Sequence, residues 1–332
     1  MTDQLQTIAD VLDEADAALA RGGSAAPAVW PTGFRLLDVQ LGGGLRAGEL
    51  CLLGGPQGLG KTAFALQLTR NVAASGNAAV VLSYEHDAAV VLQRLLAIEA
   101  GELLGPEGVS LRRVRQVMEG TGAFPGILAE RLAPLPAGRE AAYALRSWGP
   151  RLLVHRSRGS STDLAEIREV VLSTVERTGR RPVLVVDYLQ KVFVPEGGPE
   201  EERVTRVVEG LKDLALDLEI PVLAIVAADK EGIAAGRRLR IQHLRGTSAL
   251  AYEADVVLLL NDKYDVVARH HLTYDPLGAE RFRDYVVLTV EKNRSGPDHV
   301  DLQLRKHLDQ SRFDTAAELV DEQLVDERVF TD

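Results

Sequence analysis

The stretch of the chain that decides its fold is Gly55-Pro56-Gln57-Gly58-Leu59-Gly60-Lys61-Thr62. Its spacing is G-x-x-x-x-G-K-[ST], the pattern of a loop that holds phosphate groups. The apolar run 50–53 before it reads as a buried strand, and residues 62–74 after it have a helical pattern. A strand, a glycine-rich loop and a helix in this order are the context that such a loop requires. The segment therefore predicts a site for a nucleoside triphosphate, and the alternative is a glycine-rich turn without a ligand.

Each residue type in this loop has a physical task. Glycines let the backbone curl so that its N–H groups point at phosphate oxygens, and the helix N-terminus adds a partial positive charge. Lys61 would reach the β- and γ-phosphates, and the Thr62 hydroxyl would bind Mg²⁺. The expected ligand is ATP with Mg²⁺, in contact with Gly55, Pro56, Gln57, Gly58, Leu59, Gly60, Lys61, Thr62 and Ala63.

A second apolar run supplies the carboxylate that the metal side of such a site needs. Residues 182–186 read Pro-Val-Leu-Val-Val and are followed directly by Asp187. An acid at the carboxyl end of a parallel strand lies where the phosphates bind, and Asp187 would hold Mg²⁺ through water. The alternative is an aspartate that only caps a turn or a helix.

Strand and helix patterns alternate from residue 30 onward. Apolar runs typical of strands buried on both faces occur at 50–53, 79–82, 152–154, 183–186, 222–226 and 255–260. Helical patterns lie between them, for example at 62–74, 88–100 and 201–218. This alternation predicts an α/β fold with a mostly parallel central sheet and helices on both faces. Residues 285–290 and 300–304 read as a C-terminal antiparallel hairpin around the turn 293–298.

The composition is that of an ordinary globular protein of 332 residues. Its net charge of −10 argues against a protein that coats nucleic acid, but it does not exclude a local basic channel. Cys51 lies in an apolar run and reads as a core residue, and a single cysteine allows no intramolecular disulfide. The N-terminus lacks the pattern of a signal peptide and no apolar stretch can span a bilayer, so we expect a cytoplasmic protein without membrane contact.

Four segments are expected along the chain. Residues 1–22 hold an amphipathic helix over 3–20, with Leu5, Ile8, Leu12 and Leu19 near one face, and residues 23–30 read as a linker. The ATPase domain would span 31–313, followed by an acidic, loosely held tail over 314–332. The helix cannot bury its apolar stripe alone. It must pack on its own domain or on a neighbouring subunit, and the sequence leaves both open.

From about residue 30 to about 313, the sequence resembles the C-terminal ATPase domain of DnaB-type replicative helicases, a RecA-like P-loop fold. The motifs that carry the resemblance occur in the family's order: Pro31-Thr32-Gly33-Phe34, Gly43-Gly44-Leu45, the phosphate loop, Ser83-Tyr84-Glu85, Arg94-Leu95-Leu96, Asp187-Tyr188-Leu189-Gln190, Ile220-Pro221-Val222, Leu244-Arg245-Gly246, Glu253-Ala254-Asp255 and Lys292-Asn293-Arg294-Ser295-Gly296-Pro297. So many motifs in order are specific for the superfamily.

The resemblance assigns further roles to residues of this chain. Glu85 follows the strand beside the phosphate-loop strand, where RecA-like sheets carry the glutamate that orients the attacking water. Lys292 and Arg294 match the hairpin that bears the arginine finger, which reaches across a subunit boundary to a neighbour's γ-phosphate. This implies a ring, with a hexamer as the expected size. The alternatives are a plain surface acid for Glu85 and a solvated turn arginine for Arg294, while His86 reads as a solvated loop histidine.

A basic segment between Lys230 and Arg245 matches the loop that grips DNA in the ring's pore. It contains Arg237, Arg238, Arg240 and Arg245, and a local group of arginines on an acidic chain predicts contact with the phosphates of single-stranded DNA. The alternative is a solvated basic loop.

The sequence departs from the family in three ways. We expect the helicase's large helical N-terminal domain to be missing, and the helix at 3–20 stands where the family's linker helix lies. Ala227 stands where the family has a polar sensor between γ-phosphate and DNA, and the phosphate loop is closer to RadA and KaiC. The expected function is a ring-forming, ATP-hydrolysing, DnaB-like ATPase acting on single-stranded DNA, as a helicase or DNA-stimulated ATPase in replication or repair. The alternative is an ATP-dependent switch or scaffold that controls a protein partner without unwinding.

Overall fold

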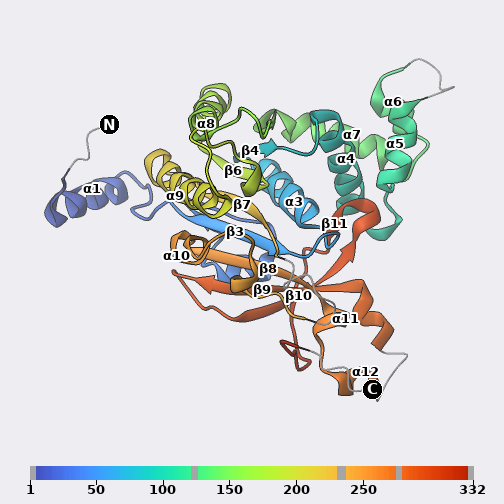
Figure 1. The fold of residues 1–332 in the computed structure, drawn as a ribbon. Coiled ribbons are helices and arrows are strands. Elements are labelled where there is room, and N and C mark those ends of the chain that lie inside the picture. The colour runs from blue at the N-terminus through green and yellow to red at the C-terminus, as the bar shows by residue number, and fades with distance from the viewer. Residues whose placement is uncertain (1–4, 121–125, 230–236, 274–278, 328–332) are drawn as a thin grey trace.

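A central twisted sheet with helices on both faces forms the body of the protein (Figure 1). The computed structural model describes residues 5–120, 126–229, 237–273 and 279–327. Within these ranges, ten strands form one sheet, in the order β11-β10-β9-β8-β3-β7-β6-β4-β5, with β12 added to β10. The strands β8, β3, β7, β6, β4 and β5 run parallel, whereas β9, β10, β11 and β12 pair antiparallel. The predicted α/β fold with a C-terminal antiparallel hairpin is confirmed.

The strands of the main sheet are β3 (Leu50–Gly55), β4 (Ala78–Ser83), β5 (Leu152–Arg156), β6 (Pro182–Asp187), β7 (Val222–Ala227), β8 (Val256–Asp262), β9 (Tyr285–Asn293), β10 (Val300–His307), β11 (Arg312–Phe313) and β12 (Glu318–Leu319). A separate pair, β1 (Val29–Trp30) and β2 (Leu45–Arg46), is antiparallel. The six parallel strands and the two hairpin strands β9 and β10 coincide with the predicted runs, whereas β1, β2, β11 and β12 were not predicted. The run 152–154 was expected to be buried on both faces, but β5 is the last strand of the sheet and is only partly buried.

The helices connect these strands. They are α1 (Ile8–Ala20), α2 (Arg35–Gln40), α3 (Lys61–Ala74), α4 (Ala88–Leu104), α5 (Leu111–Glu119), α6 (Leu128–Leu132), α7 (Gly138–Trp148), α8 (Leu164–Thr178), α9 (Glu200–Leu218), α10 (Ala249–Glu253), α11 (Lys263–Val266) and α12 (Arg269–Thr273). Apolar clusters place α3 and α4 on one face of the sheet and α8, α9 and α10 on the other. None of the helices in the described ranges is long and apolar enough to cross a membrane.

Three aromatic rings join the phosphate-loop helix to both ends of the ATPase domain. Phe64 on α3 stacks on Phe34 with ring centroids 4.6 Å apart, and it meets Phe313 edge-on at 6.1 Å. All three rings are fully buried. The Gln67 side chain of α3 accepts from the backbone N–H of Phe313 and donates to its carbonyl oxygen. The helix that opens at the phosphate loop is therefore held in place by residues far away in the sequence.

The N-terminal helix is shorter than its apolar pattern predicts. It begins at Ile8 rather than at residue 3, because Thr7 and Asp10 form a capping box that fixes the start. Residues 1–4 lie outside the described ranges. No residue of α1 is buried, and Ile8, Leu12 and Leu19 expose their apolar side chains. In Figure 1 the helix projects away from the body of the protein.

The acidic segment after Phe313 lies along the sheet rather than being loosely held. β12 pairs with β10, and Val320 donates its backbone N–H to the Asp301 carbonyl. Further on, Leu324 forms an antiparallel bridge with Val267. The expectation of a loose tail is therefore wrong for residues 314–327, since a tail of mostly polar residues can still complete the edge of a sheet through its backbone.

Candidate active site

The carboxyl ends of four parallel strands bring the predicted nucleotide site together. Gly55 at the end of β3 pairs in register with Ala227 at the end of β7, and Ser83 at the end of β4 pairs with Asp187 at the end of β6. The phosphate loop and Asp187 therefore lie at one edge of the sheet, with Glu85 two residues beyond Ser83. This is the edge where open α/β sheets bind their ligands.

The phosphate loop requires glycine at its bends. Gly58 and Gly60 have φ values of +86° and +93°, a region that other residues rarely adopt. A Cβ on Gly60 would also lie 2.8 Å from both the Leu308 and Phe313 side chains. The Lys61 ammonium donates to the carbonyl oxygens of Gly55 at 2.7 Å and Pro56 at 3.0 Å, so it lies within its own loop. Burial lowers the pKa of Lys61, while the charges of Asp187 and Glu85 oppose that shift.

Thr62 and Asp187, the two residues expected to hold Mg²⁺, are in contact in the structure. The Thr62 hydroxyl donates to Asp187 Oδ2 at 2.9 Å, which joins the first turn of α3 to the end of β6. Asp187 is almost fully buried, and this burial raises its pKa to about 6, with the Glu85 charge contributing. A buried carboxylate beside a hydroxyl is a donor set that suits a hard cation such as Mg²⁺. Phosphate oxygens and water would complete the coordination of such a cation.

Glu85 lies exposed at the entrance of this site. Its negative charge raises the pKa of the neighbouring Asp187 and opposes the lowering of the Lys61 pKa, which places its carboxylate within electrostatic range of both. An exposed carboxylate at this edge can accept a hydrogen bond from a water molecule above the phosphates. The expectation that the strand before Glu85 lies beside the phosphate-loop strand is wrong, because β7 and β6 separate β4 from β3. The carboxyl end of β4 still lies next to Asp187, so the predicted role of Glu85 stays a prediction.

Sequence reasoning gave no role to Arg94, which the structure places beside the site. Its guanidinium, half-buried on α4, donates to Ser311 Oγ at 3.2 Å and lies 3.4 Å from His86 Nε2. Burial lowers the pKa of Arg94, and the charges of Asp187 and Glu85 oppose this shift. Burial, followed by the Arg94 charge, also lowers the pKa of His86, which is half-buried rather than the solvated histidine that we expected. The signal that could have found Arg94 is a lone cation on a helix whose neighbouring turns are apolar.

Lys292 and Arg294 lie at the opposite edge of the sheet. Asn293 between them pairs with Val256, and the register of β8 places Val256 beside Cys51, near the start of β3. Four residues of strand, about 13 Å, separate that level from Gly55. Arg294 pairs with Asp255 at 3.1 Å and remains half exposed, and Lys292 donates to the Ala251 carbonyl oxygen at 2.7 Å.

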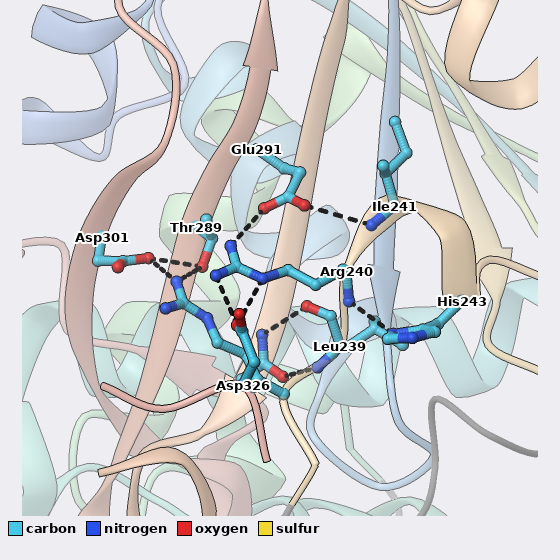
Figure 2. Close-up of polar contacts among 10 residues, drawn as sticks. Leu239, Arg240, Ile241, His243, Thr289, Glu291, Asp301 and Asp326 are labelled. Carbon is cyan, nitrogen blue, oxygen red and sulfur yellow. Dashed lines mark hydrogen bonds and ion pairs between the residues drawn. The ribbon is translucent and has the colours of Figure 1, made fainter. Parts of the chain in front are cut away.

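Three of the four predicted DNA-contacting arginines, Arg238, Arg240 and Arg245, are paired with carboxylates in this structure. Figure 2 shows Arg240 between Glu291 and Asp326, at 3.0 and 2.6 Å. Arg238 is buried and pairs with Asp301, which contradicts the expectation of a solvent-facing side chain there. Arg245 pairs with Glu200 at 2.7 Å. Arg237 lies in a backbone bridge to Glu327, and Lys230 falls outside the described residues.

Gln190, the glutamine of the Asp-Tyr-Leu-Gln motif, connects the end of β7 to the basic segment. Gln190 Oε1 accepts from the backbone N–H of Ala227 at 3.3 Å, and Gln190 Nε2 donates to the Arg245 carbonyl oxygen at 2.8 Å. Ala227 itself has no polar side chain. The polar connection between the end of β6 and the basic segment therefore runs through Gln190, to which the sequence motif alone assigned no task.

The fold and the site together define a P-loop nucleoside triphosphatase with a RecA-like core. A family model described as an AAA domain matches residues 37–232, more than half of the chain, and one described as the DnaB-like helicase C terminal domain matches residues 151–315. The chain belongs to this AAA-domain family of P-loop ATPases, and its core is a DnaB-type C-terminal ATPase domain. A site of this kind binds a nucleotide, and the chain is a DnaB-like ATPase.

Individual proteins agree with the family models. The replicative DNA helicase DnaB of Pasteurella multocida is 28% identical over 293 residues, which cover 86% of this chain and 55% of the relative. That of Treponema pallidum is 26% identical, over 69% of this chain and 47% of the relative. The chain thus spans about half the length of the curated relatives it matches.

Solved structures share the fold at low sequence identity. A structure described as an ATPase domain superposes with a TM-score of 0.71 at 17% identity, covering 93% of this chain and 99% of that one. A structure described as a DnaB-like replicative helicase and its interactions with primase gives a TM-score of 0.68 at 18% identity, covering 94% of this chain and 67% of that one. At these identities the likeness establishes the fold alone.

The raised pKa of Asp187 predicts how the stability of the nucleotide-free protein depends on pH. Between about pH 4 and pH 6 the carboxyl of Asp187 is ionised in the unfolded chain but still largely protonated in the folded chain, where it is buried. The free energy of unfolding therefore decreases as the pH rises through this window. Asp187→Asn removes that loss. We expect the variant to gain on the order of 2 kcal/mol at pH 7.5 and nothing at pH 4, measured by thermal unfolding. Exposed Asp321→Asn is the control, and a lower melting temperature of the Asp187 variant at pH 7.5 would contradict the assignment.

Proposed function

We propose that the protein hydrolyses ATP with Mg²⁺ at sites shared between subunits of a ring, and that single-stranded DNA passes along the basic segment of that ring. The observation that carries the proposal is the separation of the two halves of the site. Phosphate loop, Asp187 and Glu85 lie at one edge of the sheet, whereas Arg294 lies at the other. A second copy of the chain is the natural source of a cation for the exposed side of the phosphates.

The residues of the chain divide the chemistry between them. Without nucleotide, the Lys61 ammonium donates to the carbonyl oxygens of Gly55 and Pro56. When ATP binds, the ammonium exchanges these acceptors for phosphate oxygens, so it has hydrogen-bond acceptors in both states. Mg²⁺ held by Thr62 and Asp187 would offset the negative charge of the phosphates. Glu85 accepts a hydrogen bond from water and orients it toward the γ-phosphate. The positive charge of the cation would oppose the effect of burial on the pKa of Asp187 and favour its ionised form.

Lys61 and Glu85 should fail in different ways. Lys61→Ala removes a phosphate contact, so both nucleotide binding and turnover should fall. Glu85→Gln keeps the size of the side chain but loses the carboxylate, so we expect nearly normal ATP binding and turnover at least about 100-fold slower. Fluorescent-nucleotide binding and phosphate release measure the two quantities, with Glu102→Gln on α4 as a matched control. Near-normal turnover of Glu85→Gln would show that another group orients the water.

Ring assembly has support from surfaces that a single chain leaves uncovered. The apolar side chains of α1 are exposed, and an apolar cavity of about 340 Å³ lies between α4, α6 and α7 beside β5. Helix α1 is amphipathic and separated from the body by residues 21–28, so it can pack on a neighbour. A stripe of this kind is stable in water only when another surface buries it.

Mixing two inactive variants tests the shared site. Arg294→Ala should abolish turnover and leave nucleotide binding mostly intact, because the guanidinium acts on the charge of the transition state. A mixture of Glu85→Gln and Arg294→Ala subunits restores both groups at about one quarter of the interfaces if subunits combine at random. We expect activity to reappear in the mixture and not in either variant alone. Full activity of Arg294→Ala as a monomer would exclude a finger supplied in trans.

A switch or scaffold that acts on a protein partner is the second candidate. Two observations favour it: Arg245 is held by the exposed acid Glu200 at the start of α9, and Ala227 offers no polar side chain between nucleotide and DNA. The acids Glu200, Glu201 and Glu202 in the first turn of α9 make that side of the basic segment less attractive to phosphate.

The ATPase rate with and without single-stranded DNA separates the two functions. If the chain acts on DNA, we expect an oligonucleotide to raise turnover several-fold at low salt and progressively less as salt increases, because phosphate contacts release counterions. Double-stranded DNA of equal nucleotide concentration is the control. Turnover that no oligonucleotide changes, in a protein that does hydrolyse ATP, would favour the switch.

A further inference from the structure

The segment Glu318–Glu327, named here the C-terminal clip, lies across the arginines that were expected to contact DNA. Residues 314–327 contain six acids and no lysine or arginine. Strand β12 at the start of the clip pairs with β10, and the clip then passes between two other segments of the chain. Its path brings carboxylates to a basic segment of an otherwise acidic protein.

Backbone hydrogen bonds set the position of the clip. The N–H of Val325 donates to the Val266 carbonyl oxygen, and the N–H of Ala268 donates to that of Gln323, both at 2.8 Å. On the other side, the N–H of Arg238 donates to the Asp326 carbonyl oxygen at 2.8 Å, and Arg237 bridges to Glu327. The second half of the clip is thus an added strand between residues 266–268 and 237–238. When residues 321–327 leave, Leu324 loses its packing on the small apolar cluster around Val267 and Phe282, and Glu322 loses its ion pair with the buried Lys263. The two large apolar clusters on either side of the sheet contain no residue of 321–327 and keep their contacts.

The side chain of Asp326 takes the outer face of the Arg240 guanidinium. Asp326 Oδ1 accepts from Arg240 Nε at 2.8 Å and from Arg240 Nη2 at 2.6 Å (Figure 2). Glu291 holds the remaining Nη1 from the protein side. The two carboxylates differ sharply in exposure, 68% for Asp326 and 6% for Glu291. Glu291 therefore fixes the guanidinium, while Asp326 is a solvent-exposed anion that another anion can replace.

A phosphate oxygen would make the same two hydrogen bonds that Asp326 makes. Two parallel N–H donors of a guanidinium bind carboxylate and phosphate in the same planar, forked geometry. Because the clip belongs to the same chain, its local concentration near Arg240 is high, on the order of millimolar for a short flexible connection. A nucleic acid must therefore compete with this high local concentration of Asp326 for the Arg240 guanidinium.

We propose that the C-terminal clip is an intramolecular competitor for nucleic-acid phosphate, with Asp326 in the place that a backbone phosphate takes on Arg240. Single-stranded DNA binds residues 237–245 of the basic segment when residues 321–327 leave them. Arg238, buried against Asp301 and Thr289, stays in place and supports the segment from below. This inference rests on the proposed action on DNA, and it adds that the free chain holds its DNA-binding surface closed.

Two single substitutions in the full-length chain test the competitor. Asp326→Asn removes the charge that pairs with Arg240. Asp321→Asn removes the same charge from the same clip, but its exposed side chain forms no hydrogen bond or ion pair with any of the described residues. Binding of a labelled single-stranded oligonucleotide, measured by fluorescence anisotropy with a non-hydrolysable ATP analogue, should tighten about fivefold for Asp326→Asn and less than about twofold for Asp321→Asn. A chain ending at Val320 keeps β12 and should bind at least as tightly as Asp326→Asn.

Amide hydrogen exchange reports the clip itself. The amide hydrogens of Ala268 and Val325 form the hydrogen bonds that join the clip to residues 266–268, and neither amide belongs to the basic segment. If the clip leaves when the oligonucleotide binds, both amides should exchange faster. Equal affinities of Asp326→Asn and Asp321→Asn, or unchanged exchange at Ala268 in a chain that does bind the oligonucleotide, would overturn the competitor and leave the action on DNA standing. Absence of binding at low salt by the full-length chain and also by the chain ending at Val320 would overturn both.

Discussion

The candidate active site depends on one constraint, the common direction of β3, β4, β6 and β7. Parallel strands end at the same edge, so backbone geometry alone places the phosphate loop, Glu85 and Asp187 together. The Thr62–Asp187 hydrogen bond then closes the gap between the first turn of α3 and β6. Burial of Asp187 without a bound cation disfavours its charged form, which is why its pKa rises. The position of the phosphate loop beside Asp187 and the raised pKa of Asp187 therefore both follow from the parallel arrangement of these strands.

The sequence predicted those parts of the structure that local patterns encode. Continuous apolar runs located the parallel strands, and the glycine spacing located the phosphate loop, because both patterns depend on neighbours in the chain. The start of α1 was wrong by several residues because the Thr7–Asp10 capping box overrides the apolar period. Arg94 and Gln190 were missed as site residues, since their importance comes from contacts with Ser311 and Arg245, which are distant in the sequence.

The basic segment shows where pattern reading fails for charged residues. Arginines close together in a sequence suggest an open positive surface, but the pairing of each guanidinium is decided by strands that arrive later in the chain. Arg238 reaches Asp301 on β10, and Arg240 reaches Glu291 on β9 as well as Asp326. A count of charges cannot distinguish an arginine that supports the structure from one available to a ligand. The acidic segment after Phe313 was misjudged for the same reason, because its order comes from backbone pairing.

Asp255 gives the far edge of the sheet a role beyond packing. This buried carboxylate accepts from the Leu50 backbone N–H and from Lys212, and it also holds Arg294. Under the shared-site proposal, an arginine that turns to a neighbour's nucleotide must first give up Asp255. In the isolated subunit, Arg294 is therefore paired with Asp255 of its own chain. Under this proposal, Arg294 exchanges Asp255 for the γ-phosphate of the neighbouring subunit when that subunit binds a triphosphate. Lys212 remains on Asp255 during the exchange, so the start of β3 keeps its anchor while the interface changes state.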